Sequence, residues 1–225
     1  MPRTRVKICG IKSVEMALAA TEAGADAIGL IFVERSPRFV TPAAAKRIVA
    51  KLPAFVEPIG LFVDQSAEDV RSIADEVGLR TLQLHGHEGP GYIERLGDYR
   101  LIRSFAFERS YVREMIEPWR QVRNNLAALL WDAPPSPNKA PETALTGGSG
   151  TTFDWKGLAA SRNEGVFADM PPLILAGGLT PDNVGEAIRM TGARQVDVAS
   201  GVESAPGVKD PELMSRFLQS AAAPK

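Results

Sequence analysis

The sequence predicts an α/β fold, a (β/α)8 barrel in which residues 1–225 form a single domain. Short apolar runs alternate with segments of helical periodicity along the whole chain, and eight such strand–helix pairs can be counted. Eight is the number of parallel strands that closes this kind of barrel and leaves no sheet edge. A length of 225 residues is usual for one barrel domain. An open, doubly wound sheet is the alternative fold, but it rarely needs eight units of such even length.

The first four strand–helix pairs are defined by apolar runs, helix caps and glycines. Residues 5–10 carry apolar side chains at alternate positions and end in glycine, a pattern typical of a strand and the turn after it. Ser13, Thr41 and Ser66 each precede a segment of helical periodicity, where a hydroxyl can cap the helix. We therefore expect strands over residues 5–9, 27–33, 59–63 and 81–85, helices that begin after residues 13, 41 and 66, and a weaker helix around residues 92–96.

The last four pairs follow the same pattern with one long interruption. A connection rich in proline, glycine and threonine, residues 133–152, separates the sixth strand from a short helix near residues 155–158. Thr180-Pro181 and Asp210-Pro211 predict helix starts, because proline is tolerated in the first turn. We expect strands over residues 101–105, 126–132, 172–176 and 195–199, and a further helix over residues 112–119.

Composition and charge argue against several classes of partner. The 26 lysines and arginines nearly balance the 27 acidic residues, so the net charge of -1 predicts neither nucleic acid nor an anionic membrane as partner. No apolar run approaches the ~18 residues of a membrane span. The N-terminus leads directly into the first strand, without room for a signal peptide, and a single cysteine cannot form an internal disulfide. We expect a cytoplasmic protein.

Three turns that contain glycine lie where the last three predicted strands lead into their helices, at one end of the barrel. Glycine lets backbone N–H groups approach an anion closely, and a helix that follows adds partial positive charge. Any one of these turns could serve only to reverse the chain, but three at neighbouring strands favour a phosphate site. No P-loop motif is present, so we predict a phosphate ester of a small molecule as ligand. The predicted phosphate-binding residues are Gly148, Ser149, Gly177, Gly178, Ser200 and Gly201.

Several polar side chains lie at the carboxyl ends of predicted strands, where parallel barrels hold their active sites. Cys9 ends the first strand and Asp132 ends the sixth, on nearly opposite walls of the barrel. An acid and a thiolate base that face each other across a substrate suit proton transfer. Closure of the barrel makes the first and eighth strands neighbours, so that Lys7 and Asp197 can pair. Further candidates, on one face of the fourth strand, are Gln83 and His85.

Each catalytic candidate also has a plain structural explanation. A lone cysteine is most often a small buried hydrophobe, although the start of the following helix should favour the thiolate of Cys9. Asp132 could cap its strand end, but a carboxylate directly after apolar residues 129–131 favours a function. Asp154 is the rival acid and has the sequence context of a helix N-cap. Both histidines lie within residues 85–87, so histidines from several strands cannot converge, and we predict no metal.

Seven short motifs occur together in one order, and their combination is highly specific. They are residues 7–10 (Lys-Ile-Cys-Gly), 83–86 (Gln-Leu-His-Gly), 147–150 (Gly-Gly-Ser-Gly), 153–155 (Phe-Asp-Trp), 176–179 (Ala-Gly-Gly-Leu), 196–198 (Val-Asp-Val) and 200–203 (Ser-Gly-Val-Glu). Through these motifs the chain, from residue 5 to about residue 217, resembles the phosphoribosylanthranilate isomerases, barrel enzymes of tryptophan biosynthesis.

The resemblance implies an Amadori rearrangement of N-(5-phosphoribosyl)anthranilate to 1-(2-carboxyphenylamino)-1-deoxyribulose 5-phosphate, without a cofactor, by a monomer or homodimer. By position, Cys9 matches the general base that removes the C2′ proton, and Asp132 matches the general acid that opens the furanose. Arg38 matches the arginine that faces the anthranilate carboxylate, and Asp197 matches a residue near the sugar hydroxyls. The glycine turns and Ser200 match the phosphate cradle.

Two departures from the family pattern stand beside the predicted acid. Trp131 takes the place of the leucine that commonly precedes it, and residues 133–146 form a longer, proline-rich segment. Neither departure removes a reacting group. One rival function, a pentulose-phosphate epimerase, would need several metal ligands at strand ends, which the sequence lacks. Another rival, a binding protein that keeps only the phosphate cradle, would bind a ligand without turning it over.

Overall fold

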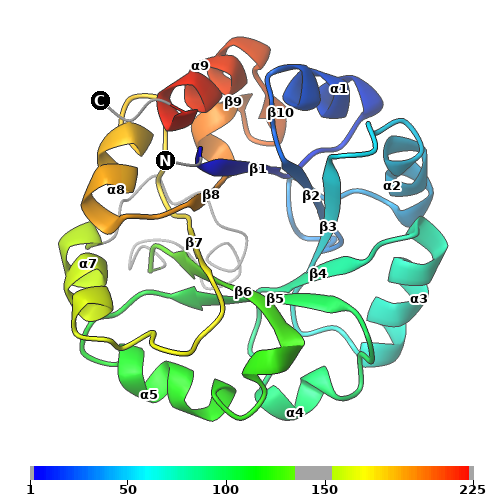
Figure 1. The fold of residues 1–225 in the computed structure, drawn as a ribbon. Helices are drawn as coiled ribbons and strands as arrows, with labels where there is room; N and C mark the ends of the chain where they lie inside the picture. The colour runs from blue at the N-terminus through cyan, green and yellow to red at the C-terminus, as the bar shows by residue number, and fades with distance from the viewer. Residues whose placement is uncertain (1–2, 135–153, 223–225) are drawn as a thin grey trace.

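The computed structural model describes residues 3–134 and 154–222, and eight parallel strands form a closed barrel there. Each strand pairs with the next along the chain, and β1 pairs with β8 to complete the ring. The helices surround this barrel on its outer side (Figure 1). The predicted (β/α)8 fold is therefore confirmed. The described part contains no helix long and apolar enough to cross a membrane.

The strand bounds differ by at most two residues from those that the apolar runs predict. The strands are β1 (Arg5–Cys9), β2 (Ala27–Ile31), β3 (Glu57–Phe62), β4 (Thr81–Leu84), β5 (Arg100–Ala106), β6 (Leu126–Asp132), β7 (Leu173–Leu175) and β8 (Gln195–Val198). Successive residues of a strand point alternately into the barrel and toward the helices. Register therefore decides which polar groups share the interior, and it sets Lys7 of β1 beside Asp197 of β8.

The first three helices begin after capping side chains, as the sequence predicts. Ser13, Thr41 and Ser66 each accept a hydrogen bond from the backbone N–H three residues later. The helical elements are α1 (Val14–Glu22), α2 (Pro42–Val49), α3 (Ala67–Val77), α4 (Pro90–Ile93), α5 (Val112–Ile116), η1 (Glu117–Trp119), η2 (Arg123–Asn125), α7 (Trp155–Asn163), α8 (Val184–Thr191), η3 (Ser200–Val202) and α9 (Pro211–Ala222).

Helix α8 begins later than Thr180-Pro181 predicts. The side chain of Asn183 accepts a hydrogen bond from the N–H of Thr180 and donates one to the carbonyl of Gly178. These two bonds hold residues 180–183 as a turn, so the helix starts only at Val184. The turn is part of the carboxyl-end surface of the barrel, next to the glycines that follow β7.

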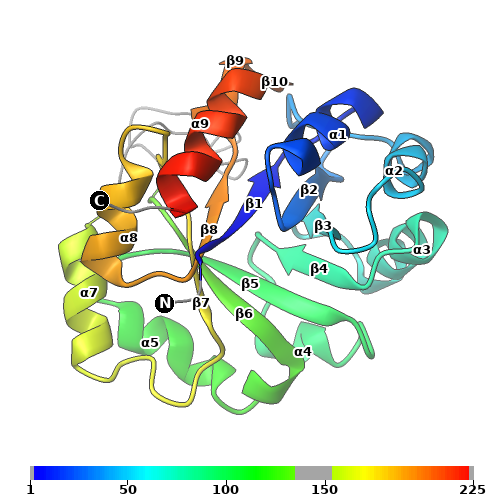
Figure 2. The same ribbon diagram turned by 45° about the horizontal axis from the view of Figure 1, so that its top comes forward.

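A short antiparallel hairpin follows β8 and has no counterpart in the predicted elements. Its strands are β9 (Glu203–Ala205) and β10 (Val208–Lys209), and Lys209 lies opposite Glu203 in the register. The hairpin lies between helices α1 and α9 in both ribbon views (Figures 1 and 2). A strand of two or three residues shows no measurable period, which is why the sequence pattern did not reveal it.

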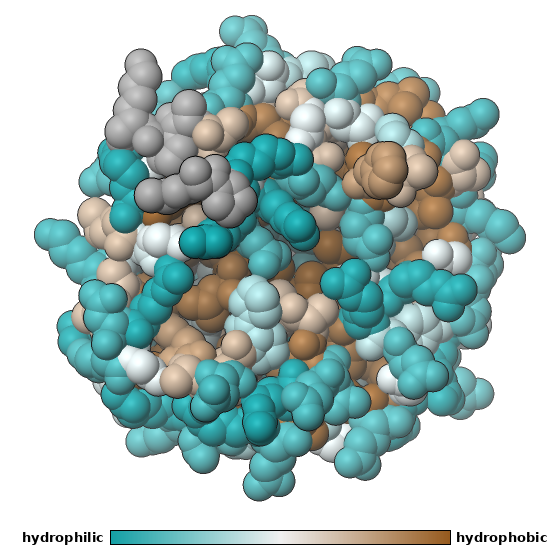
Figure 3. Space-filling model, viewed as in Figure 1, coloured by the Kyte–Doolittle hydropathy of each residue, from teal (hydrophilic) through white to brown (hydrophobic). Residues whose placement is uncertain are grey.

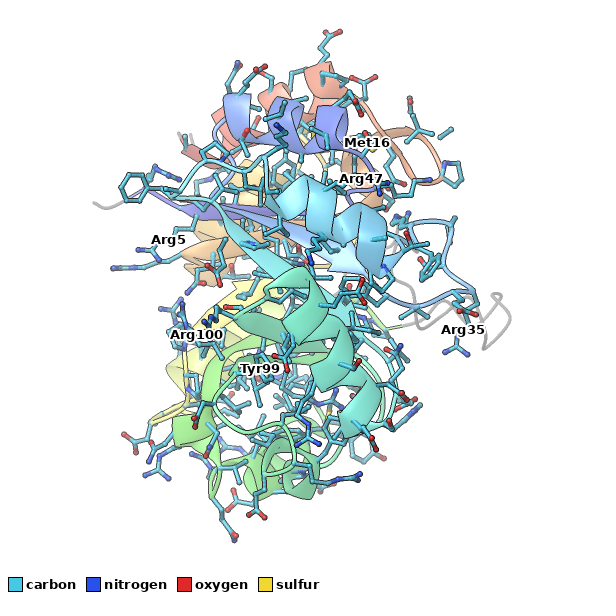
Figure 4. All side chains as sticks on the ribbon, turned by 90° about the vertical axis from the view of Figure 1, so that its right-hand side faces the viewer. Arg5, Met16, Arg35, Arg47, Tyr99 and Arg100 are labelled. Carbon is cyan, nitrogen blue, oxygen red and sulfur yellow. The ribbon has the colours of Figure 1, made fainter. Side chains whose placement is uncertain are left out.

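The two ends of the barrel differ in character. Figure 4 shows Arg5 and Arg100 at the end of the barrel where the strands begin. Arg35, in the loop after β2, lies at the opposite end. A hollow of about 170 Å³ opens among the strand starts, with Glu57 and Thr81 in its lining. Apolar side chains lie at the centre of this face, within a hydrophilic rim (Figure 3). Cys9, His85 and Asp132 stand at the other end, where their strands end.

Candidate active site

Lys7 and Cys9 project from one face of β1, and a glycine on β2 gives both of them room. A Cβ atom on Gly29 would lie 2.6 Å from the sulfur of Cys9 and 3.1 Å from Cε of Lys7, so only glycine fits at this position. Lys7 Nζ donates a hydrogen bond to Asp197 Oδ1 at 2.9 Å, and both side chains are buried. The predicted pair therefore forms, and it ties the first strand to the last beside the thiol.

The thiol of Cys9 is buried, which opposes its ionisation. Burial raises its pKa above the ordinary value, while the positive charges of Lys7 and Lys209 oppose that shift. The expectation that the next helix favours the thiolate was wrong, because α1 begins only at Val14 and burial dominates. The groups that favour the thiolate are therefore side-chain cations. The apolar side chains around the sulfur are Ile31, Val33, Leu61 and Val63.

Asp132 ends β6, and the residue before it explains where its carboxyl group lies. Trp131 is fully buried and stacks on Phe105, so Asp132, the next residue, turns to the other face of the strand. Burial raises the pKa of Asp132 to about 6, the negative charge of Asp197 adds to this, and the N–H of Ala133 opposes it. A carboxyl group that keeps its proton close to neutral pH is suited to general acid catalysis.

His85 follows β4 and faces Asp132, with 3.6 Å between its Nε2 atom and Oδ2 of the carboxylate. The side-chain amide of Gln83 donates to Nδ1 of His85 and to Oγ of Ser104, each at 3.1 Å. Because Nδ1 accepts, the ring proton is on Nε2 and points to Asp132. Burial lowers the pKa of His85 to about 4, with the charges of Lys7 and Arg103 adding to the effect. The ring is a neutral hydrogen-bond donor.

The two described glycine turns, after β7 and after β8, are in direct contact. A Cβ atom on Gly201 would lie 1.8 Å from the carbonyl oxygen of Leu179, so the two turns can pack together only with glycine here. The N–H groups of Gly177 and Gly178 donate to no acceptor within residues 3–134 and 154–222. With Ser200 at the start of η3, this surface offers unused donors to an anion. The predicted residues Gly148 and Ser149 lie outside the described residues.

Arg38 is buried and forms a two-point ion pair. Its Nε and Nη2 atoms donate to the two carboxylate oxygens of Glu203, both at 2.8 Å. The stem of Arg38 crosses directly over Gly10, whose φ of +85° and missing side chain allow the approach. The arginine therefore lies next to the residue that follows Cys9. The sequence predicts Arg38 as a ligand contact, and the structure brings it to the same end as Cys9.

The comparisons with known proteins agree on one family. A family model described as N-(5'phosphoribosyl)anthranilate (PRA) isomerase matches residues 6–220. The chain belongs to this family. The N-(5'-phosphoribosyl)anthranilate isomerase of a Geobacter species is 43% identical over 218 residues, which cover 97% of this chain and 98% of the relative. That of Neisseria gonorrhoeae is 40% identical over 228 residues, which cover 98% of each.

Solved structures of phosphoribosylanthranilate isomerases share the fold. The enzyme of Thermotoga maritima has a TM-score of 0.81 and 36% identity, with 97% of this chain and 98% of that one covered. A second structure, a complex with reduced 1-(o-carboxyphenylamino)-1-deoxyribulose 5-phosphate, has a TM-score of 0.79 and 33% identity over the same shares. Like the members of the phosphoribosylanthranilate isomerase family that it matches, the chain is an isomerase.

Sequence reasoning about the phosphoribosylanthranilate isomerase motifs missed three side chains that support the predicted site. Ser104 accepts a hydrogen bond from Gln83. Glu203 binds Arg38, and Lys209 in turn binds Glu203. Glu203 closes one of the quoted motifs, so its proximity to the site was within reach of the pattern. Lys209 has no such signal, because it reaches the site only through the unpredicted hairpin.

The remaining candidates lie apart from this centre. Asp154, the rival acid, accepts a hydrogen bond from the N–H of Gly157 at 2.8 Å and caps α7, as its sequence context indicates. His87 is exposed and pairs with Asp64, so its ring does not converge with that of His85. Neither Asp154 nor His87 faces Cys9 or Asp132 by any described contact.

Proposed function

We propose that residues 1–225 act as one phosphate-binding barrel domain that converts N-(5-phosphoribosyl)anthranilate to 1-(2-carboxyphenylamino)-1-deoxyribulose 5-phosphate, a step of tryptophan biosynthesis in the cytoplasm. The observation that carries this proposal is a carboxyl group of raised pKa and a buried thiol at the same end of the barrel. The charges of Lys7 and Asp197 act on the pKa of both groups, which supports a shared site for the two. The proposal needs no cofactor, metal, nucleic acid or membrane, and allows a monomer or a homodimer.

In the proposed reaction Asp132 gives its proton to the ring oxygen of the ribose. The C1′–O bond breaks, the nitrogen lone pair forms an iminium ion at C1′, and the opened oxygen becomes a hydroxyl group. The thiolate of Cys9 then removes the proton from C2′, and the electrons of that C–H bond form an enolamine. Its tautomer is the ketone product, and no oxidant or reductant is needed. Acid and base catalysis by two positioned side chains suits this sequence of proton transfers.

The neighbouring side chains have separate tasks in this scheme. The charge of Lys7 favours the thiolate of Cys9, and Asp197 holds Lys7 while it offers oxygens to sugar hydroxyls. The Nε2 proton of His85 faces Asp132 and stabilises the carboxylate that remains after proton transfer. Gln83 orients His85 through its Nδ1 atom. Of the two predicted substrate contacts, Gln83 and His85, it is His85 that acts on the general acid, Asp132.

The anionic ends of the substrate meet different parts of the site. The phosphate group lies against the turns after β7 and β8, where the N–H groups of Gly177 and Gly178 are unused and Ser200 begins η3. The anthranilate carboxylate lies near Arg38. Gly148 and Ser149 belong to the same proposed phosphate site by their match to the family motif.

The test of the proposed function is turnover of freshly prepared phosphoribosylanthranilate, followed as loss of its fluorescence. The wild-type protein should turn it over, and Cys9→Ala should lose at least about 10²-fold in kcat, the range expected for a lost general base. Asp154→Asn is the matched control, since asparagine also caps helices and the residue is outside the site. Wild-type protein that binds the reduced product without turnover would instead be a binding protein. Near-normal kcat in Cys9→Ala would exclude the thiol as base.

A further inference from the structure

Three buried charged side chains form a cluster on the hairpin β9–β10. Glu203 accepts two hydrogen bonds from Arg38 and one from Lys209, all at 2.8 Å. The three side chains are 6% (Arg38), 4% (Glu203) and 0% (Lys209) exposed. Lys209 Nζ also donates to the carbonyl oxygen of Ala199 at 2.8 Å, which fixes it to the end of β8. The hairpin thus clamps the loop that carries Arg38.

The cluster holds one positive charge more than it holds negative. Although burial acts to raise the pKa of Glu203, the bonds from Arg38 and the charge of Lys209 hold it below the ordinary value, so Glu203 is ionised. Burial lowers the pKa of Lys209, while the charge of Glu203 and the hydrogen bond to it oppose this shift, so one carboxylate faces two basic groups. A buried charge is normally paired with an opposite charge, so a buried cluster with excess positive charge favours binding of an anion. Without Lys209, Glu203 would neutralise Arg38 completely.

Within residues 3–134 and 154–222, no carboxylate other than Glu203 pairs with Arg38 or Lys209. Burial raises the pKa of the Cys9 thiol, so the unliganded site does not supply a thiolate at neutral pH. Asp197 is already paired with Lys7. Arg38 uses Nε and Nη2 for Glu203, and its Nη1 has no hydrogen-bond partner within the described ranges. The unused donor is therefore on a guanidinium group that belongs to this positively charged cluster.

From these contacts, and on the basis of the proposed function, we propose that Lys209 is a specificity-determining positioning residue for this isomerase. Glu203 fixes the plane of the Arg38 guanidinium through two bonds. Lys209 offsets the charge of Glu203, so that the positive charge of Arg38 stays available for the carboxylate of the substrate's aromatic ring. Lys209 contacts Glu203 and not the ligand. The pair makes the site selective for an aromatic amine that carries a carboxylate.

The test compares two ligands that differ only in that carboxylate. The probes are the reduced product, 1-(2-carboxyphenylamino)-1-deoxyribitol 5-phosphate, and its counterpart made from aniline. Lys209→Gln keeps hydrogen-bonding groups but removes the charge. Its preference for the carboxylated ligand should fall about tenfold, the effect of one charge at roughly 10 Å and an effective dielectric constant of about 20. Affinity for the aniline counterpart should stay within about twofold of wild type, since that ligand lacks the group concerned.

Two matched variants separate charge from structure. Lys12→Gln removes a cation from the same face, where Lys12 donates to Pro37, and should leave the preference unchanged. Lys209→Arg should restore most of the preference, because it restores the charge. Where Lys209→Gln does not fold, Lys209→Met fills the buried space without charge and carries the same expectation.

A folded, uncharged variant at position 209 that keeps the wild-type preference would overturn the proposal, as would a wild-type protein that binds both ligands equally. Wild-type turnover of phosphoribosylanthranilate is measured in parallel. Its absence would refute the proposed function, whereas turnover with an unchanged preference in the variant would refute only the role of Lys209.

Discussion

Replacement of Asp132 by asparagine should change the shape of the pH dependence as well as the rate. The proposed reaction needs Asp132 protonated and Cys9 ionised at the same time. Burial raises the pKa of Asp132 to about 6 and raises the pKa of Cys9 above its ordinary value. The group that must hold a proton thus has the lower pKa, so the reactive form is a minor one at every pH.

The size of this minor population follows from the two pKa values. Well above the pKa of Asp132 and below that of Cys9, each unit of pH lowers protonated Asp132 about tenfold and raises ionised Cys9 about tenfold, so their product stays constant. Because the pKa of Cys9 is raised and lies above that of Asp132, only a small fraction of molecules has both groups in the reactive form. The wild-type kcat/KM should therefore be flat between pH 7 and pH 9, a range in which the substrate phosphate, with its pKa near 6, is already a dianion.

In Asp132→Asn only the ionisation of Cys9 remains in the profile. Its residual kcat/KM, at least about 10²-fold below wild type at pH 7, should then rise about 100-fold between pH 7 and pH 9. The assay is initial-rate loss of substrate fluorescence in a buffer series, with Asp154→Asn as the control that keeps the flat profile. A flat profile in Asp132→Asn would show that the carboxyl group of Asp132 is not the titrating acid. A wild-type rate that already rises tenfold per pH unit would refute the reversed order of pKa values.

Two further predictions concern acid stability and the phosphate end. In the folded state the pKa of His85 is about 4 instead of 6.5, so its stabilisation is full above pH 6.5 and is lost as pH falls to 4, by about 3 kcal/mol. The raised pKa of Asp132, about 6 instead of 3.8, works in the opposite direction by about 3 kcal/mol over nearly the same range. Asp132→Asn should therefore lose about 3 kcal/mol more than wild type between pH 6.5 and pH 4 in urea titrations, and equal losses would contradict these pKa values. Gly201→Ala should raise KM for the substrate at least about tenfold, because its Cβ would meet the carbonyl oxygen of Leu179 and push the two turns apart. Gly89→Ala, which meets nothing, is its control, and an unchanged KM in Gly201→Ala would place the phosphate elsewhere.

Local signals in the sequence predicted the fold because they depend on near neighbours along the chain. Ser13, Thr41 and Ser66 cap helices through bonds that span three residues, so a short window contains both partners. The sequence pattern places the start of α8 too early. Asn183 binds the carbonyl of Gly178 and forms a turn, and the pattern does not tell this turn from a first turn of helix. Register then brought Lys7 to Asp197 as expected, since barrel closure follows from the strand count alone.

The electrostatics of the site could not be predicted in the same way. The pKa of Cys9 depends on how deeply the sulfur is buried and on Lys209, which lies 200 residues away in the sequence. The neutral state of His85 depends on its burial, and the position of its ring proton depends on Gln83, which also donates to Ser104 on the next strand. Such effects arise from packing between strands, and period or spacing carries no information about them.

Burial raises the pKa of both proposed catalytic groups, which helps the acid and hinders the base, and the cations around the thiol offset this shift only in part. Burial supplies Asp132 with the proton that an acid needs, but it opposes the charge that Cys9 needs as a base. A substrate with a phosphate and a carboxylate adds negative charge, which by itself would suppress the thiolate further. If the phosphate meets the unused N–H groups after β7 and the carboxylate meets Arg38, those charges are balanced where they bind. The charge of Lys7 is then not drawn to the substrate and continues to lower the pKa of Cys9. The described cations at this end of the barrel thus have a use beyond pairing with carboxylates of the protein.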